Sequence, residues 1–233
     1  MKNAPYFAIQ QAEREACVQI YGDITPYPWF KSDVSALSIA EQIAQIDADV
    51  IHVHIDSYGG AVSEGWAIYN ALRAHPAKII THGDGFVASA ALYPFLAGEE
   101  RIACNPSAYF LHEVSVGAHG YADDLRKAAE EADVMTDIGI AAFVENTKLT
   151  AEEVRELMEN ETWLSPMEAL EKGIATSIAN AEAPNTPGQS VKHTLLRSVL
   201  CKTPAPAPKK PEPQPAERLM QALAGHFYTG KED

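Results

Sequence analysis

Four short stretches of this chain carry residue types suited to acyl transfer. Ser57-Tyr58-Gly59-Gly60 joins a strand-like run to a helix-like run, and Ser89 follows a second strand-like run among small residues. His112 lies 23 residues after Ser89, and Glu161 lies 49 residues after His112. A serine hydroxyl is a weak nucleophile, so it needs a general base, a group that orients this base and donors for an oxyanion. The four stretches offer a candidate for each role.

Each feature taken singly also has a structural explanation. The glycine pair Gly59-Gly60 is typical of any tight turn between a strand and a helix. Ser89 lies among alanines near an expected helix start, a position where serine is typical as a cap or a small packing residue. His112 ends a strand-like run, where a histidine is ordinarily solvated or satisfied. The order of these features along one chain is therefore what predicts chemistry.

Strand-like and helix-like segments alternate around these residues. Apolar runs predict strands near 17–22, 50–55, 77–82, 101–104, 108–112 and 174–178. Helical periodicity predicts helices near 38–46, 61–75, 88–97, 121–147, 151–158 and 166–172. Capping boxes are expected at three helix starts, namely Ser38 with Glu41, Thr150 with Glu153, and Ser165 with Glu168. Such alternation predicts an α/β domain with a largely parallel sheet.

From Tyr21 to about Ile178 the chain resembles the Clp-type serine peptidases, the proteolytic subunits of ATP-dependent bacterial proteases. The family's Ser-Pro-Gly-Gly turn is matched by Ser57-Tyr58-Gly59-Gly60, and its Gly-x-x-Ala-Ser motif by Gly85-Phe86-Val87-Ala88-Ser89. Its strand-end histidine is matched by Leu111-His112. Its acidic residue, which precedes an aromatic residue and a Ser-x-x-Glu-Ala helix start, is matched in Glu161-Thr162-Trp163-Leu164-Ser165-Pro166-Met167-Glu168-Ala169. Four motifs in one order are more specific than any single one.

The resemblance implies a role for each matched residue. Ser89 would be the nucleophile, His112 the general base and later the general acid, and Glu161 the group that orients the imidazole. The backbone N–H groups of Gly60 and Ala90 would form the oxyanion hole. The resemblance also implies the crotonase-type ββα spiral of Clp peptidases, with a protruding helical handle.

The chain departs from the family pattern at several of these positions. Glu161 replaces the usual aspartate, and Asn160 or Glu159 is an alternative for its role. Tyr58 replaces the turn proline, and Ala90 replaces a common methionine. None of these changes removes a backbone donor, but the last one is expected to reshape the pocket for the substrate side chain.

Three segments resemble a subgroup of the family found in phages and prophages. They are Tyr21-Gly22-Asp23-Ile24, Glu161-Thr162-Trp163-Leu164 and the helix that begins at Tyr121. In that setting such enzymes are associated with capsid maturation, where they trim scaffold and head proteins. The resemblance therefore implies a serine endopeptidase that acts on polypeptides during phage capsid maturation, in the cytoplasm of a bacterial host.

Other functions stay open at this point. One alternative is a housekeeping proteolytic subunit of an ATP-dependent Clp protease. A second is a crotonase-fold enzyme acting on an acyl thioester, and a third is a catalytically idle capsid-assembly protein. The resemblance implies a homo-oligomeric ring or double ring, with an ATPase unfoldase or a capsid or scaffold protein as partner. The apolar second half of the expected helix 121–147 suits a subunit contact or a place in the core.

Composition narrows the class of protein further. The net charge of −14 comes from an acidic body, since residues 1–183 hold 11 basic and 28 acidic side chains, and this argues against a nucleic-acid partner. No signal peptide or membrane span is expected, because no apolar run reaches the required length. The three cysteines (Cys17, Cys104 and Cys201) are widely spaced, which fits a reducing cytoplasm without a disulfide framework. His52 and His54 alternate on one strand but have no third ligand nearby, so neither a metal nor a cofactor is expected.

A change of composition marks the end of the expected catalytic body. Eight of the 15 prolines fall between Pro184 and Pro215, and residues 184–233 carry 7 basic and 4 acidic side chains. We therefore expect a peptidase domain over 1–183, an extended proline-rich linker over 184–215 and a short helix or tail over 216–233.

Overall fold

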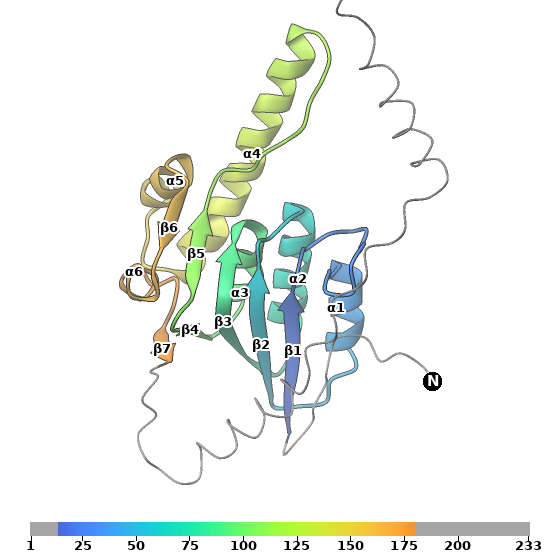
Figure 1. The fold of residues 1–233 in the computed structure, drawn as a ribbon, viewed down its shortest axis with the longest axis vertical. Coiled ribbons are helices and arrows are strands. Elements are labelled where there is room, and N and C mark those ends of the chain that lie inside the picture. Colours follow the sequence, from blue (N-terminus) through green and yellow to red (C-terminus); the bar gives the residue numbers. More distant parts are fainter. Residues whose placement is uncertain (1–13, 180–233) are drawn as a thin grey trace, which may run out of the picture. The chain divides into compact units, whose positions relative to one another are not determined.

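The computed structural model describes residues 14–179, and these residues form an α/β fold around one sheet (Figure 1). The strands are β1 (Glu15–Tyr21), β2 (Val50–Ser57), β3 (Lys78–Ala88), β4 (Glu100–Cys104), β5 (Ala108–Leu111), β6 (Thr162–Leu164) and β7 (Ser177–Ala179). The helices are α1 (Ala36–Ile43), α2 (Val62–Ala74), the 3₁₀ turn η1 (Ser89–Ala91), α3 (Leu92–Leu96), α4 (Ala122–Asn146), α5 (Ala151–Glu159) and α6 (Pro166–Glu171). The linker and tail predicted over 184–233 lie outside the described residues.

The sheet is mainly parallel, as predicted. Its order is β1-β2-β3-β4-β7, and all of these pairs are parallel. The later part of β3 carries a second branch, in which β5 pairs parallel to β3 and β6 pairs antiparallel to β5. This branch places the end of β5, and His112 directly after it, beside the end of β3.

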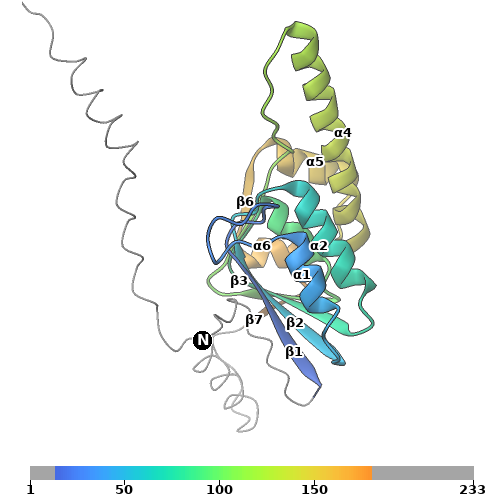
Figure 2. The same cartoon turned by 90° about the vertical axis from the view of Figure 1, so that its right-hand side faces the viewer.

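Side chains alternate between two unlike faces along β2. Ile51, Val53 and Ile55 are fully buried, whereas His52 and His54 between them are only partly covered. The buried set packs with the apolar sides of α1, α2 and α3, which lie together on one face of the sheet (Figure 2). Burial of large aliphatic side chains of this kind stabilises the fold by about 1.5–3 kcal/mol each.

The structure corrects one of the three predicted capping boxes. Helix α1 is capped by Ser35 rather than Ser38, because Ser35 Oγ accepts from Ser38 N and Ser38 Oγ accepts from Ser35 N, both at 3.2 Å. Ser38, which was predicted to be the cap, thus occupies the third helical position and takes the role predicted for Glu41. The boxes at Thr150 and Ser165 are confirmed.

Helix α4 is 25 residues long and divides into two halves, and its first half extends away from the sheet (Figures 1 and 2). In the second half Ile140 and Phe143 are buried in the core, while Val134 and Ile138 are 57% and 55% exposed. The helix therefore packs on the core through one side and leaves a second apolar side uncovered by the described residues.

Candidate active site

Ser89 stands at the junction of β3 and η1 with a backbone φ of +54°. This left-handed conformation is unfavourable for a residue with a side chain, so the surrounding structure has to impose it. The neighbours Ala88, Ala90 and Ala91 are small and buried, which lets the chain turn sharply there. A sharp turn from strand to helix exposes the nucleophile in other serine hydrolases.

His112 follows β5 directly, and its ring contacts the Ser89 hydroxyl. Its Nε2 lies 2.7 Å from Ser89 Oγ, although the two residues are 23 positions apart in the chain. The segment after the histidine is tied to α4, because Val114 N donates to Thr136 Oγ1 at 3.1 Å. With Nε2 unprotonated, this geometry lets the imidazole take the hydroxyl proton as the oxygen attacks.

The glycine turn after β2 packs against the Ser89 turn. Gly59 and Gly60 have φ values of +93° and +140°, which favour glycine. A Cβ on Gly59 would lie 2.5 Å from Ala88 O and 2.8 Å from Ala90 N, so only a glycine fits between the two turns. Ser57 Oγ supports the turn by accepting from Gly59 N at 3.0 Å.

The N–H of Gly60 is left out of the bonds that anchor this turn. Ile24 N donates to Gly59 O and Ala61 N donates to Ile24 O, both at 2.8 Å. Neither bond uses the Gly60 N–H, to which the family resemblance gives a place in the oxyanion hole together with the N–H of Ala90. Gly60, Ser89 and Ala90 line one pocket, so the structure brings both predicted donor residues together with the serine.

Glu161 is exposed, and it has a φ of +47° between α5 and β6. The antiparallel pairing of β5 and β6 ends with Leu111 opposite Thr162, so His112 and Glu161 are the next residues beyond the last pair. Within residues 14–179, however, no hydrogen bond or ion pair joins the Glu161 carboxylate to the imidazole. The alternative Asn160 donates its amide to Glu156 O at 2.8 Å, and Glu159 is exposed at the end of α5. Which group orients His112 thus stays a prediction.

A pocket of about 140 Å³ opens beside Ser89 and His112. The glycine turn forms part of its wall, and apolar side chains from three helices form another part. Those side chains belong to Leu92, Tyr93, Phe143 and Met158. Sequence reasoning missed all four, since helical periodicity marks them as core residues and gives no sign that the core opens next to the serine.

Three comparisons with known proteins bear on this arrangement. The sequence profile described as Clp protease matches residues 6–182, which is well over half of the chain. The chain belongs to the Clp protease family.

Curated relatives of this Clp-family chain include two proteins named as proteolytic subunits of an ATP-dependent Clp protease. Subunit 2 of Pseudomonas aeruginosa is 32% identical over 150 residues, which cover 63% of this chain and 75% of the relative. Subunit 3 of Rhizobium meliloti is 28% identical over 169 residues, which cover 70% and 83%. Both are named as components of an ATP-dependent protease, so the Clp-family chain is a serine-type peptidase, as predicted.

The Clp-family fold is also found among solved structures. A ClpP1 variant from Listeria monocytogenes superposes with a TM-score of 0.62 at 24% identity, covering 71% of this chain and 92% of the other. This likeness confirms the predicted α/β class at the level of the fold. Among the described residues of the Clp-family chain, no helix is long and apolar enough to cross a membrane.

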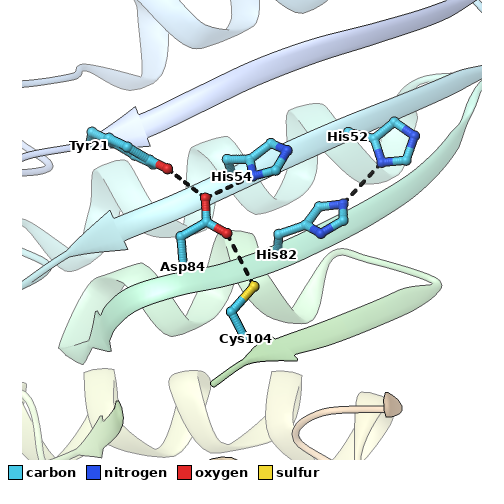
Figure 3. Close-up of polar contacts among 6 residues, drawn as sticks. All are labelled: Tyr21, His52, His54, His82, Asp84 and Cys104. Atoms are coloured by element: carbon cyan, nitrogen blue, oxygen red, sulfur yellow. Dashed lines mark hydrogen bonds and ion pairs between the residues drawn. The ribbon is translucent and has the colours of Figure 1, made fainter. Parts of the chain in front are cut away.

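A second polar network of the Clp-family chain lies on the sheet face opposite α1, α2 and α3 (Figure 3). Asp84 joins side chains from three other strands: Oδ2 accepts from Tyr21 at 2.5 Å and pairs with His54 Nδ1 at 2.8 Å, and Oδ1 accepts from Cys104 Sγ at 3.3 Å. Beside it, His54 stacks on His82 with ring centroids 4.3 Å apart. One carboxylate thereby ties β1, β2, β3 and β4 together near their carboxyl ends.

The pKa values within this network follow from burial and pairing. Burial alone would lower the pKa of His54, but the hydrogen bonds to Asp84 and Cys17 and the Asp84 charge raise it to about 9. Burial alone would raise the pKa of Asp84, but the His54 partner and the Tyr21 and Cys104 donors lower it to about 2. The two groups therefore form a charged pair at neutral pH.

His52 and His54 lie near each other on β2, as their alternation predicted, and His82 of β3, which the sequence did not indicate, lies beside both of them. His52 Nδ1 lies 3.0 Å from His82 Nε2, so these rings bond to each other. Among the described residues of the Clp-family chain, no group of three or more His, Cys, Asp and Glu side chains is arranged to hold a metal ion.

Proposed function

We propose that this Clp-family chain hydrolyses peptide bonds through an acyl-enzyme formed on Ser89. The 2.7 Å contact between Ser89 Oγ and His112 Nε2 carries this proposal, since it pairs a hydroxyl in a strained turn with a base that can deprotonate it. The adjoining glycine turn offers a backbone N–H for the oxyanion, and the pocket offers space for a substrate side chain.

The reaction proceeds in two halves. Ser89 Oγ attacks the carbonyl carbon while His112 Nε2 takes the hydroxyl proton, and the carbonyl oxygen becomes an oxyanion held by the N–H groups of Gly60 and Ala90. The intermediate then collapses, the C–N bond breaks, and His112 gives its proton to the departing amine. A water molecule attacks the ester in the second half, with His112 again as base, and frees Ser89.

Glu161 is assigned to orient the imidazole in this scheme. The register of β5 and β6 supports the assignment, because its last pair sets Leu111, the residue before His112, opposite Thr162, the residue after Glu161. An accepting carboxylate would hold the Nδ1 hydrogen and stabilise the imidazolium that forms during attack. The assignment requires the Glu161 side chain to turn toward the ring.

The pocket beside Ser89 selects the substrate residue next to the scissile bond. Its lining is mixed, and its volume of about 140 Å³ suits a single side chain that packs on Leu92, Phe143 and Met158. Ala90, which stands where the family commonly has methionine, leaves more room in the wall of this pocket.

We assign polypeptides as substrates and a homo-oligomeric ring as the working form, with an ATPase unfoldase or a capsid or scaffold protein as partner. The names of the relatives support the ATPase, since they are subunits of an ATP-dependent protease. The role in phage capsid maturation rests on sequence resemblance alone, at Tyr21–Ile24, at Glu161–Leu164 and in the helix that begins at Tyr121. A housekeeping Clp subunit is the alternative that the relatives' names favour.

A fluorophosphonate probe tests the acyl-enzyme directly. Such a probe reacts with an activated serine, so we expect covalent labelling of the full-length chain, with the added mass on the peptide that contains Ser89. The His112→Ala variant should label at least about a hundredfold more slowly, since the base is lost. Absence of labelling, or labelling of Ser57 or Ser115 instead, would favour a thioester enzyme or an idle assembly protein.

A further inference from the structure

Three aromatic rings form a stacked row that ends on the candidate base. Trp163 stacks on Phe110 with ring centroids 4.4 Å apart and planes 23° apart. Phe110 in turn stacks on His112 at 5.3 Å, again with planes 23° apart. The row therefore runs from an exposed position on β6 to the imidazole that contacts Ser89.

The sheet fixes this row through strand alternation and register. Phe110 and His112 are two residues apart along the β5 direction and so project from one face, while Tyr109 and Leu111, which alternate with them, are buried on the other. The antiparallel pair places Trp163 directly opposite Phe110. Rings directly opposite each other in an antiparallel pair contact closely, which stabilises the pair by a few tenths to about 1 kcal/mol.

The imidazole needs such support in this structure. Its Nε2 is held by Ser89, but a single hydrogen bond leaves the ring free to swing about that contact. Within residues 14–179 no carboxylate bonds to its other nitrogen. The Phe110 ring, which is packed between His112 and Trp163, restricts the tilt of the imidazole, and its face also attracts the imidazolium that forms during attack.

We propose that Trp163 is a positioning residue for the reaction, which acts on His112 through Phe110. The inference rests on the proposed function, since it assumes that His112 is the base. Trp163 is 50% exposed, so filling the core is not its main role. Its other ring contact is an edge contact with Phe86 of β3, with ring centroids 5.7 Å apart.

Two substitutions in the full-length chain separate ring stacking from bulk. Trp163→Phe keeps an aromatic face for Phe110, whereas Trp163→Leu keeps apolar bulk without a ring. Trp29→Ala is the matched control, because Trp29 is 88% exposed and lies in a loop away from the row. All variants are assayed on one fluorogenic peptide at a temperature at which circular dichroism shows them to be folded.

We expect Trp163→Leu to lower kcat about three- to tenfold with KM changed less than twofold, because a stacked aromatic pair contributes about 0.5–1.5 kcal/mol. Trp163→Phe should stay within about twofold of the unmodified chain, and Trp29→Ala should match it. Equal kcat values for the Leu and Phe variants, or a loss confined to KM, would overturn the inference. Ser89→Ala distinguishes this failure from that of the proposed function, since normal turnover in that variant would remove His112 from the chemistry altogether.

Discussion

Ser89 holds a left-handed backbone conformation that proteins seldom give to a residue with a side chain. The cost is offset by its neighbours, since small alanines flank it and Gly59 packs against its turn. The hydroxyl thereby reaches the imidazole of His112 at 2.7 Å. The contact between Ser89 and His112 therefore depends on the small size of Gly59 and the flanking alanines as much as on the two proposed catalytic side chains.

Replacing Gly59 tests this dependence. A Cβ at Gly59 would collide with the backbone of Ala88 and Ala90, so Gly59→Ala should displace either the glycine turn or the Ser89 turn. We expect kcat/KM for peptide hydrolysis to fall about 10- to 100-fold, the usual effect of displacing catalytic groups by about an ångström. Gly117→Ala is the control, because a Cβ on Gly117 would meet no atom within 4 Å. Normal activity in Gly59→Ala would show that the close approach is dispensable.

The pair of His54 and Asp84 makes stability depend on pH. The pKa of His54 is raised to about 9 in the folded protein, so its contribution is complete below its ordinary pKa of 6.5 and is lost as pH rises through about 9. The pKa of Asp84 is lowered to about 2, so its contribution is present above its ordinary 3.8 and is lost as pH falls through about 2. The pair therefore stabilises the fold most between about pH 4 and 6.5.

Asp84→Asn should lower the free energy of unfolding by about 1–3 kcal/mol at pH 6, because His54 loses its charged partner. The difference from the unmodified chain should shrink above pH 9. Denaturant unfolding at pH 6 and pH 9.5 measures both values. Asp49→Asn, which breaks an exposed ion pair with Arg14, should have little effect. A loss that is the same at both pH values would mean that the charged pair is not its source.

Among the elements, β4 and the segments packed on it depend on a buried cation. Arg101 is 8% exposed and donates to four backbone carbonyls, those of Gly98, Asn146, Gly173 and Ile174, at 2.7–2.9 Å. The guanidinium thus joins β4, the end of α4 and the segment before β7. Its donors fit the carbonyls because they lie in a planar fork.

Arg101→Met should lower the free energy of unfolding by about 3 kcal/mol or more, since it leaves several buried carbonyls without a donor. Arg126→Met, which removes an exposed ion pair with Asp123, should cost less than about 1 kcal/mol. Thermal or denaturant unfolding of both variants gives the comparison. Similar costs for the two would show that water replaces the guanidinium.

The elements show how far local patterns predict this fold. The parallel strands and most helices could be predicted, because their apolar periods of two or about 3.6 residues reflect one buried face. Strand β6 could not, since Thr162–Leu164 is three residues long and forms only because β5 is there to pair with it. Strand β3 continues past its predicted end through Gly83 and Gly85, which local propensity marks as breakers.

The same limit explains what was missed at the site. The order of motifs predicted that Ser89 and His112 meet, but the row of Phe110 and Trp163 depends on the unpredicted strand β6. The contact of Asp84 with side chains from three other strands likewise depends on sheet order, which a single sequence does not reveal.

For the whole molecule, the separation of peptidase and tail is the main expectation. Every residue assigned to the site lies between Ser57 and Trp163, and the Clp family profile ends at residue 182. Removing 184–233 should therefore leave kcat and KM for a short peptide within about twofold. Peptide hydrolysis and gel filtration of the truncated chain check this. A truncated chain without activity, or with a different oligomeric state, would make the tail part of the enzyme.

The account depends most on Ser89 as the nucleophile, and turnover of one fluorogenic peptide by Ser89→Ala tests it most directly. A nucleophile that forms a covalent intermediate cannot be replaced by a methyl group, so we expect kcat/KM to fall by several orders of magnitude, about 10⁴-fold or more. His112→Ala should fall by a similar amount and Glu161→Ala by less. Near-normal hydrolysis by a folded Ser89→Ala variant would contradict the account.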